Sequence, residues 1–244
     1  MFNEDQLIVL AEEILFISYD PMDLSNRAII IDSTSYNLNL RTIHDTLYPP
    51  AVSGTIITCT IIAGVVVGST LTSNPAFDVG SWPAGVIINL VVQGRIEGRG
   101  GDGGQGSGHA GANGGTALYT RFAISVDFTA AQIWAGGGGG GGGGSKNGGG
   151  GGGAAGSLPG YGGGLAGTGG TPGTDGTLTT GGSGGAGGGS NSGGNGGGPG
   201  LDGTAGNAGG INPGGAKGIK GNAIDGVSLL TITGTGDRRG TEIN

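Results

Sequence analysis

Apolar residues in the first part of the chain follow two different periods. Between Glu4 and Ile17 they recur at helical spacing, which predicts an amphipathic helix. Short strands are predicted at Ala28 to Ile31 and, from alternating polarity, at Tyr36 to Leu40. β-branched residues dominate Thr55 to Val67 and Val86 to Val92, so mainly strands are expected there. The helix either packs on its own domain or docks onto another subunit, and the pattern leaves both open.

Beyond Val86 the chain repeats one arrangement, in which an apolar strand-like run leads into glycine. The runs are Val86 to Val92, Phe122 to Phe128 and Ala223 to Ile232. A disordered linker has no reason to return to such runs at intervals. We therefore expect the three units to stack as a small sheet or solenoid that holds both ends of the glycine segments.

Glycine dominates the rest of the chain. The sequence contains 66 glycines, and only five of them precede residue 94. Uninterrupted runs extend from Gly136 to Gly144 and from Gly148 to Gly153. Such runs are either flexible linkers or extended polyglycine helices that pack closely because glycine has no side chain. Serine is sparse and the chain returns to strands, so ordered helices are the preferred interpretation.

Specificity must come from the inserts between the glycine runs, since glycine presents no side chain to a partner. If neighbouring helices are antiparallel, alternate inserts gather at one end and form a surface of loops on a rigid scaffold. Tyr161 is the only aromatic residue after Trp134. It suits stacking on a sugar or on an apolar patch, although an exposed turn tyrosine is an equal alternative. The candidate binding residues are Leu158, Pro159, Tyr161, Leu165, Pro172, Thr174, Asp175, Leu178, Leu201, Asp202 and Asn212.

Charge and composition exclude several classes of protein. Residues 1–97 carry ten acidic residues and three arginines, so the net charge of −7 resides there. No basic surface for nucleic acid is expected. The apolar run from Ile56 to Val67 is too short and too polar to span a bilayer, so no membrane insertion is expected. A single cysteine, Cys59, provides no disulfide framework.

Motifs for catalysis are weak. Gly181 to Gly185 satisfies the G-x-S-x-G pattern but lacks the preceding strand and following helix. His44, in a predicted loop, is read as a surface residue beside Asp45, and His109 as a residue facing solvent or a receptor. Two isolated histidines form no metal site, and no paired carboxylates stand out for glycoside hydrolysis. We expect no enzyme activity, no cofactor and no metal.

The glycine-rich part resembles a known family. The stretch Arg95 to Gly104, the glycine run after Trp134, and the closing stretch Ala223 to Gly236 are similar to the receptor-binding tips of tailed bacteriophages. Such segments occur in adhesins that cap T-even-like long tail fibres and at the ends of some siphophage tail-tip proteins. The resemblance covers residues 86–244. For the long tail fibre adhesins it implies glycine helices packed into a sandwich, with connecting loops that contact the host receptor.

The combined expectation is a mainly β protein with a short N-terminal helix and a C-terminal polyglycine II helix bundle bracketed by strand rungs, with little or no α-helix there. Residues 1–85 would attach to other tail or fibre proteins. Residues 86–244 would bind a bacterial outer-membrane protein or surface glycan from the virion, with a homotrimer as one way to gain avidity. The alternative is a structural spike or collar protein whose glycine domain only packs on other subunits. A glycine-rich antifreeze-like bundle is disfavoured by the irregular inserts.

Overall fold

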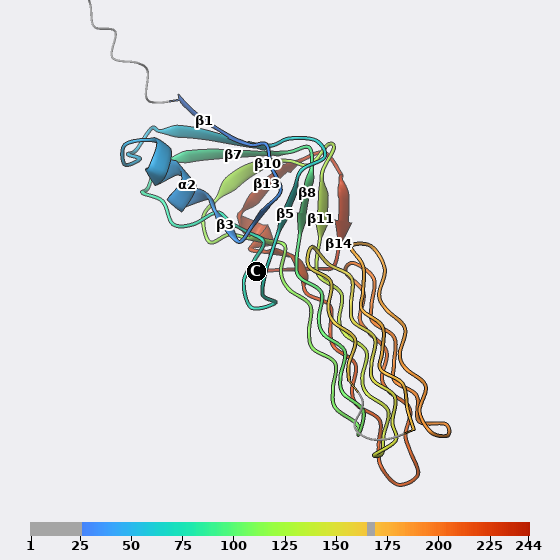
Figure 1. Ribbon diagram of the computed structural model, residues 1–244. Coiled ribbons are helices and arrows are strands. Elements are labelled where there is room, and N and C mark those ends of the chain that lie inside the picture. The colour runs from blue at the N-terminus through green and yellow to red at the C-terminus, as the bar shows by residue number, and fades with distance from the viewer. Residues whose placement is uncertain (1–25, 165–168) are drawn as a thin grey trace, which may run out of the picture.

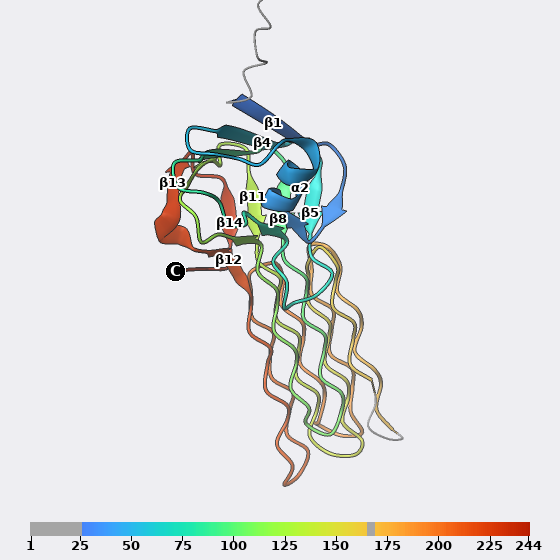
Figure 2. The same ribbon diagram turned by 90° about the vertical axis from the view of Figure 1, so that its left-hand side faces the viewer.

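The computed structural model describes residues 26–164 and 169–244. A compact head of strands carries a long bundle of extended segments that project away from it in one direction (Figure 1). The same segments remain side by side when the molecule is turned (Figure 2). The helix predicted at Glu4 to Ile17 and the candidate residue Leu165 lie outside the described residues. Within the described residues, no helix has the length and hydropathy needed to cross a membrane.

Three parallel five-stranded sheets form the head, and the chain visits them in rotation. Sheet A has the order β1-β4-β7-β10-β13, sheet B the order β14-β11-β8-β5-β2, and sheet C the order β15-β12-β9-β6-β3. Each circuit adds one strand to every sheet, so the head is a three-sided solenoid. The strands of sheet A are β1 (Asn26–Ile31), β4 (Ile56–Ile61), β7 (Ile87–Val92), β10 (Ile124–Asp127) and β13 (Leu230–Thr233). Those of sheet B are β2 (Ser35–Tyr36), β5 (Val66–Gly68), β8 (Arg95–Glu97), β11 (Gln132–Trp134) and β14 (Asp237–Arg239). Those of sheet C are β3 (Leu38–Asn39), β6 (Phe77–Asp78), β9 (Leu118–Tyr119), β12 (Asn222–Asp225) and β15 (Thr241–Ile243).

The predicted stacking of the three apolar runs is confirmed, because β7, β10 and β13 are consecutive neighbours in sheet A. The third run differs in detail from the expected single strand. It divides into β12, a 3₁₀ turn at Val227–Leu229, and β13. Gly226 adopts a φ of 108°, a left-handed conformation that favours glycine, and there the chain turns from sheet C to sheet A.

The strand predicted at Tyr36 to Leu40 is wrong in a similar way. β2 ends at Tyr36, β3 begins at Leu38, and the two belong to different sheets. Asn37 between them has a φ of 52°, which asparagine tolerates better than most residues. Alternating polarity was present, but it marked a corner of the solenoid rather than one continuous strand.

Helix α2 (Leu40–Leu47) occupies a segment read from the sequence as a loop. The side chain of Asn39 accepts a hydrogen bond from the Thr42 backbone N–H and caps the helix. His44 is fully buried rather than on the surface; its Nε2 lies 2.6 Å from Arg27 Nη1 and its ring packs edge-on against Trp82. The asparagine cap followed by apolar residues at helical spacing was the available signal for this helix.

The core consists of aliphatic side chains stacked in register from one rung to the next. In sheet A, Ile29, Cys59, Leu90, Val126 and Ile232 share one row across the five strands. Sheet B contributes a row of Val67, Ile96 and Ile133. Sheet C contributes a row of Leu38, Phe77, Leu118 and Ile224. Burial raises the pKa of the Cys59 thiol to about 12, so this cysteine is an inert core residue.

On the edge strands β14 and β15, charged residues follow the aliphatic rows of sheets B and C. Arg238 and Glu242 occupy the positions that follow Ile133 and Ile224, and they form an ion pair of 2.9 Å. At the other end Arg27 takes the position next to Ile57 and donates a hydrogen bond to the Pro49 carbonyl. Open ends of parallel sheets otherwise invite pairing with further strands, so the ion pair between Arg238 and Glu242 limits unspecific stacking at the C-terminal end.

The glycine segments are two insertions at one corner of the solenoid. Residues 98–117 connect β8 to β9, and residues 135–221 connect β11 to β12, so both leave sheet B and return to sheet C. The predicted boundary between residues 85 and 86 falls between β6 and β7, and the three sheets continue across it.

Hydrogen bonds around the central run, residues 136–144, follow a period of three. The N–H groups of Gly136, Gly139 and Gly142 donate to Gly115, Ala112 and His109. The N–H groups of Gly137, Gly140 and Gly143 donate to the carbonyls of Ala155, Gly152 and Gly149, respectively. Those of Gly138, Gly141 and Gly144 donate to the carbonyls of Leu201, Thr204 and Asn207. Every N–H of the run is thus paired, with N···O distances of 2.8–3.0 Å, although the run itself is neither α-helix nor sheet.

Carbonyl groups of the same run accept from three further segments. Gly137 and Gly140 accept from the N–H groups of Gly101 and Gly104, respectively. Gly138 and Gly141 accept from those of Gly197 and Gly194. Gly136 and Gly139 accept from those of Gly221 and Gly218. The run is therefore enclosed by six neighbouring segments. All nine of its glycines are buried, which explains why no side chain is tolerated here.

Candidate functional site

Turns at the free end of the bundle form the first candidate surface, here called the tip. They comprise residues 105–109, 144–148, 187–191 and 207–213, which hydrogen bonds place around the far end of the central run. Lys146 is the only Lys, Arg, Asp or Glu among these described turns. Ile211 is 100% exposed and sits in a small hairpin closed by the bridge between Gly209 and Asn212. The tip thus offers hydroxyl and amide groups around the exposed side chain of Ile211.

A hollow near the base of the bundle forms the second candidate surface. It measures about 320 Å³ and brings together four of the predicted residues, with Thr70, Arg99 and Gly176 completing its wall. The four are Leu158, Pro159, Tyr161 and Asp175. Tyr161 is 65% exposed, and its backbone N–H donates to the Asp102 carboxylate at 2.9 Å. Asp175 accepts from the Gly162 N–H at 2.7 Å, so backbone contacts fix both residues while the tyrosine ring faces solvent.

The other predicted residues are dispersed. Leu178 and Leu201 are exposed near the base, and Asp202 beside them forms an ion pair of 2.8 Å with Lys217. That lysine and the Lys220 backbone N–H hold the pKa of the Asp202 carboxyl below its usual range. Further along the bundle lie Thr174 and Pro172, and Asn212 lies at the tip. Of the ten predicted residues that the structure describes, four therefore meet in the hollow, one lies at the tip, and the other five lie elsewhere on the bundle.

Ile211 is not among the candidate binding residues selected from the sequence, although it stands out in the insert Pro199 to Pro213 together with Leu201, Asp202 and Asn212. Its signal was an isolated aliphatic residue between Gly210 and Asn212-Pro213, where a turn is expected and no core is available to bury it.

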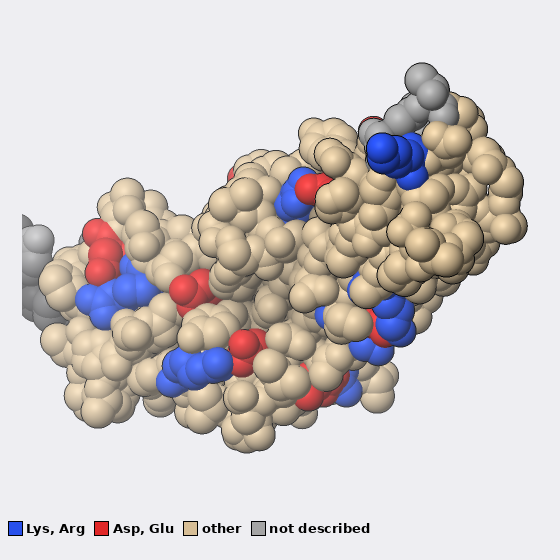
Figure 3. Space-filling view, turned by 90° about the horizontal axis from the view of Figure 1, so that it is seen from below, with Lys and Arg blue, Asp and Glu red and all other residues tan. Residues whose placement is uncertain are grey.

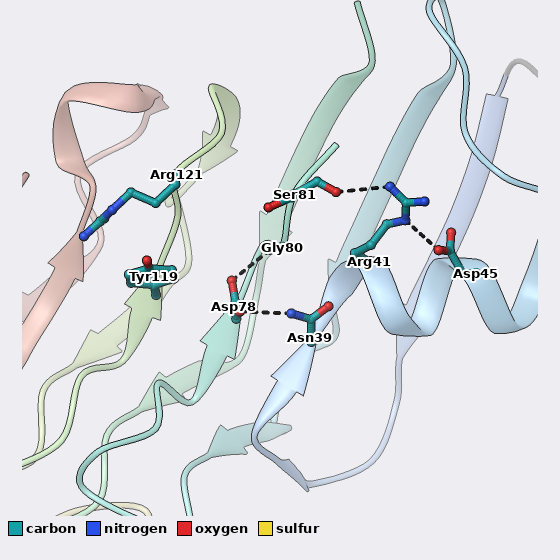
Figure 4. A pocket seen from close by; sticks show the side chains of 8 residues that line it. All are labelled: Asn39, Arg41, Asp45, Asp78, Gly80, Ser81, Tyr119 and Arg121. Carbon is teal, nitrogen blue, oxygen red and sulfur yellow. Dashed lines mark hydrogen bonds and ion pairs between the residues drawn. The ribbon is translucent and has the colours of Figure 1, made fainter. Parts of the chain in front are cut away.

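A polar groove of about 490 Å³ lies on sheet C beside helix α2 (Figure 4). Asn39, Asp78 and Tyr119 stand in register across β3, β6 and β9. Asn39 Nδ2 donates to Asp78 Oδ2 at 2.9 Å, and the Gly80 N–H donates to Asp78 Oδ1 at 2.8 Å. At the margins Arg41 pairs with Asp45, and Arg121 pairs with Asp225. Partners within the protein thus engage these charged groups, and the groove contains no nucleophile held by a base.

The junction between solenoid and bundle contains a buried carboxyl group. Glu97 ends β8 and is fully buried, and its Oε2 lies 3.3 Å from Arg95 Nη1. Its Oε1 and the neighbouring Trp134 Nε1 have no hydrogen-bond partner among the described residues. The Trp134 ring lies between Arg95 and Arg239, whose guanidinium carbons are 3.9 Å and 4.1 Å from the ring centre. Burial raises the pKa of Glu97 to about 7, against the opposing effect of Arg95.

Charges on the surface occur mainly as neighbouring pairs. Seen from below, blue and red atoms lie together in small groups on a largely uncharged surface (Figure 3). The ion pairs of the described residues include Arg99 with Asp102 and Arg238 with Glu242. No group of three or more histidine, cysteine, aspartate or glutamate residues is arranged to hold a metal within the described part of the chain.

The chain belongs to the phage tail fibre adhesin Gp38 family, whose model matches residues 26–243. It is accordingly a tail fibre adhesin of the virion. The N-terminal 25 residues lie outside the match.

A solved structure shares the fold. The crystal structure of the gp37-gp38 adhesin tip complex of the bacteriophage S16 long tail fibre matches with a TM-score of 0.61 and 24% identity, over 96% of this chain and 92% of that one. Comparison with curated protein sequences gives no match.

Proposed function

We propose that this adhesin binds a receptor on the bacterial surface through turns held rigidly by its glycine bundle. The observation that carries the proposal is the central run 136–144, whose complete hydrogen bonding fixes the surrounding segments. Turns on such a scaffold keep their positions without a conventional core, so little ordering entropy is lost on binding. The receptor is an outer-membrane protein or a surface glycan.

We further propose that the glycine segments are polyglycine II helices. This helix has three residues per turn, which matches the period of three in the hydrogen bonds of residues 136–144. With three residues per turn, successive N–H groups point to three different neighbours. Six enclosing segments are what hexagonal packing of such helices requires.

The head is proposed to attach the adhesin to the fibre through residues 1–85. The S16 structure is a complex of gp37 with gp38, which supports a second tail fibre protein as the partner here as well. A homotrimeric arrangement of the adhesin would add avidity but is not needed for this attachment.

Tip and hollow are the proposed receptor contacts. The tip offers Ile211 and Asn212, and the hollow offers Tyr161 with Leu158, Pro159 and Asp175. Leu165, Pro172, Thr174, Leu178, Leu201 and Asp202 complete the proposed contact residues. Recognition without catalysis fits the engaged carboxylates of the sheet C groove and the inert Cys59.

Binding of purified adhesin to host cells tests the proposal. Saturable binding that is competed by outer-membrane protein or by lipopolysaccharide is expected, and the effective competitor identifies the receptor class. A folded adhesin that shows no cell binding, but assembles into fibres, would leave only the structural role in a spike or collar.

Exchanging the insert 154–180 between host-range variants is expected to change adsorption, because this segment supplies most of the hollow. The measurement is the adsorption rate on the two hosts. As a control, exchange of residues 222–233, which form solenoid strands, should leave host preference unchanged. Unaltered host range after the 154–180 exchange would contradict a role for the hollow.

Replacing Ile211 by serine is expected to weaken binding to cells by about tenfold or more, since burying an aliphatic side chain at an interface contributes roughly 1.5–3 kcal/mol. Stability should not change, because Ile211 is fully exposed. The matched control is Ile219→Ser, an isoleucine that is 48% accessible and is not among the proposed contact residues. Equal cell affinity of wild type and Ile211→Ser in a titration would remove Ile211 from the contact surface.

A further inference from the structure

Three asparagines in the bundle are followed by glycine, and they differ in the hydrogen bonds of the side-chain amide and of the next backbone N–H. They are Asn113, Asn147 and Asn195. Asparagine followed by glycine is the pair most prone to intramolecular attack of the next backbone nitrogen on the side-chain amide, since glycine puts no side chain in the way. The geometry of each pair decides whether that attack is open.

Two of the three are locked in the glycine lattice. Asn113 Oδ1 accepts from the Ile219 N–H at 2.9 Å, and the following Gly114 N–H donates to the Ile219 carbonyl at 2.8 Å. Asn195 Oδ1 accepts from the Gly184 N–H at 2.9 Å, and the Gly196 N–H donates to Gly182 at 2.9 Å. In both pairs, the amide and the attacking nitrogen are engaged by another segment of the bundle.

Asn147 lies in the turn at the tip between the two long glycine runs. Its side chain is exposed and makes no hydrogen bond within the described residues. The Gly148 N–H donates only to the Ser145 carbonyl at 2.9 Å, a contact inside the same turn. The Asn147 carbonyl accepts from the Gly188 N–H at 2.9 Å, so turning the Asn147–Gly148 peptide towards the side chain loosens one bond to another segment. The side-chain amide and the attacking nitrogen themselves make no bond to another described segment, in contrast to those of Asn113 and Asn195.

We propose that Asn147 is a site of spontaneous deamidation that changes the charge and backbone of the tip. The Gly148 nitrogen bonds to the Asn147 Cγ and gives up its proton to solvent, while the Cγ–Nδ2 bond breaks and ammonia leaves. Water then opens the resulting succinimide. Addition at Cγ yields aspartate, and addition at the main-chain carbonyl yields isoaspartate, so the balance is one ammonia lost and one water gained.

Both products alter the tip. Either one places a carboxylate beside Lys146, among turns whose described residues contain no other charged Lys, Arg, Asp or Glu side chain. Isoaspartate also adds one methylene to the main chain directly before Gly148 to Gly153. Gly149 and the residues after it are bonded one by one to other segments, so this extra length strains the turn rather than the run.

Peptide mapping by mass spectrometry of the full chain, held in slightly alkaline buffer, tests the proposal. Asn147 should convert about tenfold faster than Asn113 and Asn195, since freeing either of those amides first costs about 1–1.5 kcal/mol for the hydrogen bond. In denaturant the three rates should converge. Asn212, at the same tip but followed by Pro213, has no attacking N–H and should stay intact in both conditions.

The proposal would be overturned if Asn113 or Asn195 deamidated as fast as Asn147 in the folded protein. It would also be overturned if Asn147 deamidated in denaturant but stayed unreacted in the folded protein. The variant Asn147→Gln should abolish the modification, and Asn147→Asp should reproduce the added charge in native gel mobility. These readouts do not depend on receptor binding, so they stand apart from the proposed function.

Discussion

Replacing Gly140 by alanine is expected to disrupt the glycine bundle while the solenoid stays folded. A Cβ atom at this position would lie 2.1 Å from the Gly194 carbonyl oxygen and 2.5 Å from its carbon. These are backbone atoms, which cannot move aside as a flexible side chain can. Gly140 also donates to Gly152 and accepts from Gly104, so any displacement breaks bonds to other segments. The cost should exceed the roughly 1–3 kcal/mol of ordinary overpacking.

The matched control is Gly198→Ala. There the nearest atom to an added Cβ is a Leu201 methyl carbon at 3.6 Å, an ordinary contact. This substitution should be neutral or stabilise by up to about 1 kcal/mol, because alanine restricts the unfolded chain. Limited proteolysis of residues 98–221 combined with thermal unfolding distinguishes the two variants. Equal protease resistance would contradict the tight packing of the central run.

The stability of the adhesin is expected to fall as the pH rises from about 4.5 to above 7, because of Glu97. Burial raises the pKa of this carboxyl from 4.5 to about 7 in the folded protein. The folded state therefore holds a proton that the unfolded chain has already released, so raising the pH favours unfolding. A shift of this size corresponds to about 3 kcal/mol once Glu97 is ionised.

Glu97→Gln should remove this pH dependence. The variant should equal the wild type near the lower end of the range and exceed it by about 3 kcal/mol on the alkaline side. Glu242→Gln serves as the control, since Glu242 pairs with Arg238 at 2.9 Å on a partly exposed end of the solenoid. Denaturant titrations at several pH values measure the difference. Parallel stability profiles of wild type and Glu97→Gln would show that the carboxyl is solvated at the junction.

Local signals identified several elements because their cause is local. The β-branched run around Ile57 and the runs leading into glycine became strands, as their periodicity required. The corner at Asn37 and the helix after Asn39 were not predicted. At Asn37 one residue in a left-handed conformation ends the strand, and at Asn39 a side-chain cap starts the helix, so in both places a single residue outweighs the apolar pattern around it. Four candidate residues met in one hollow, but nothing in the sequence indicated that Thr70 and Arg99 would complete it.

The sequence by itself determined that the chain has strands, and that the glycine-rich part can be ordered only by backbone packing, since it lacks side chains for a core. Tertiary structure alone decided that the strands wind into three sheets and that both glycine segments leave at the same corner. It also decided which turns reach the tip and why Glu97 is buried. The physical reason is that strand propensity acts between near neighbours. The neighbours of a glycine run are set by hydrogen bonds between segments that are distant in the sequence. Because glycine has no side chain, the sequence of the run contains no pattern that predicts these neighbours.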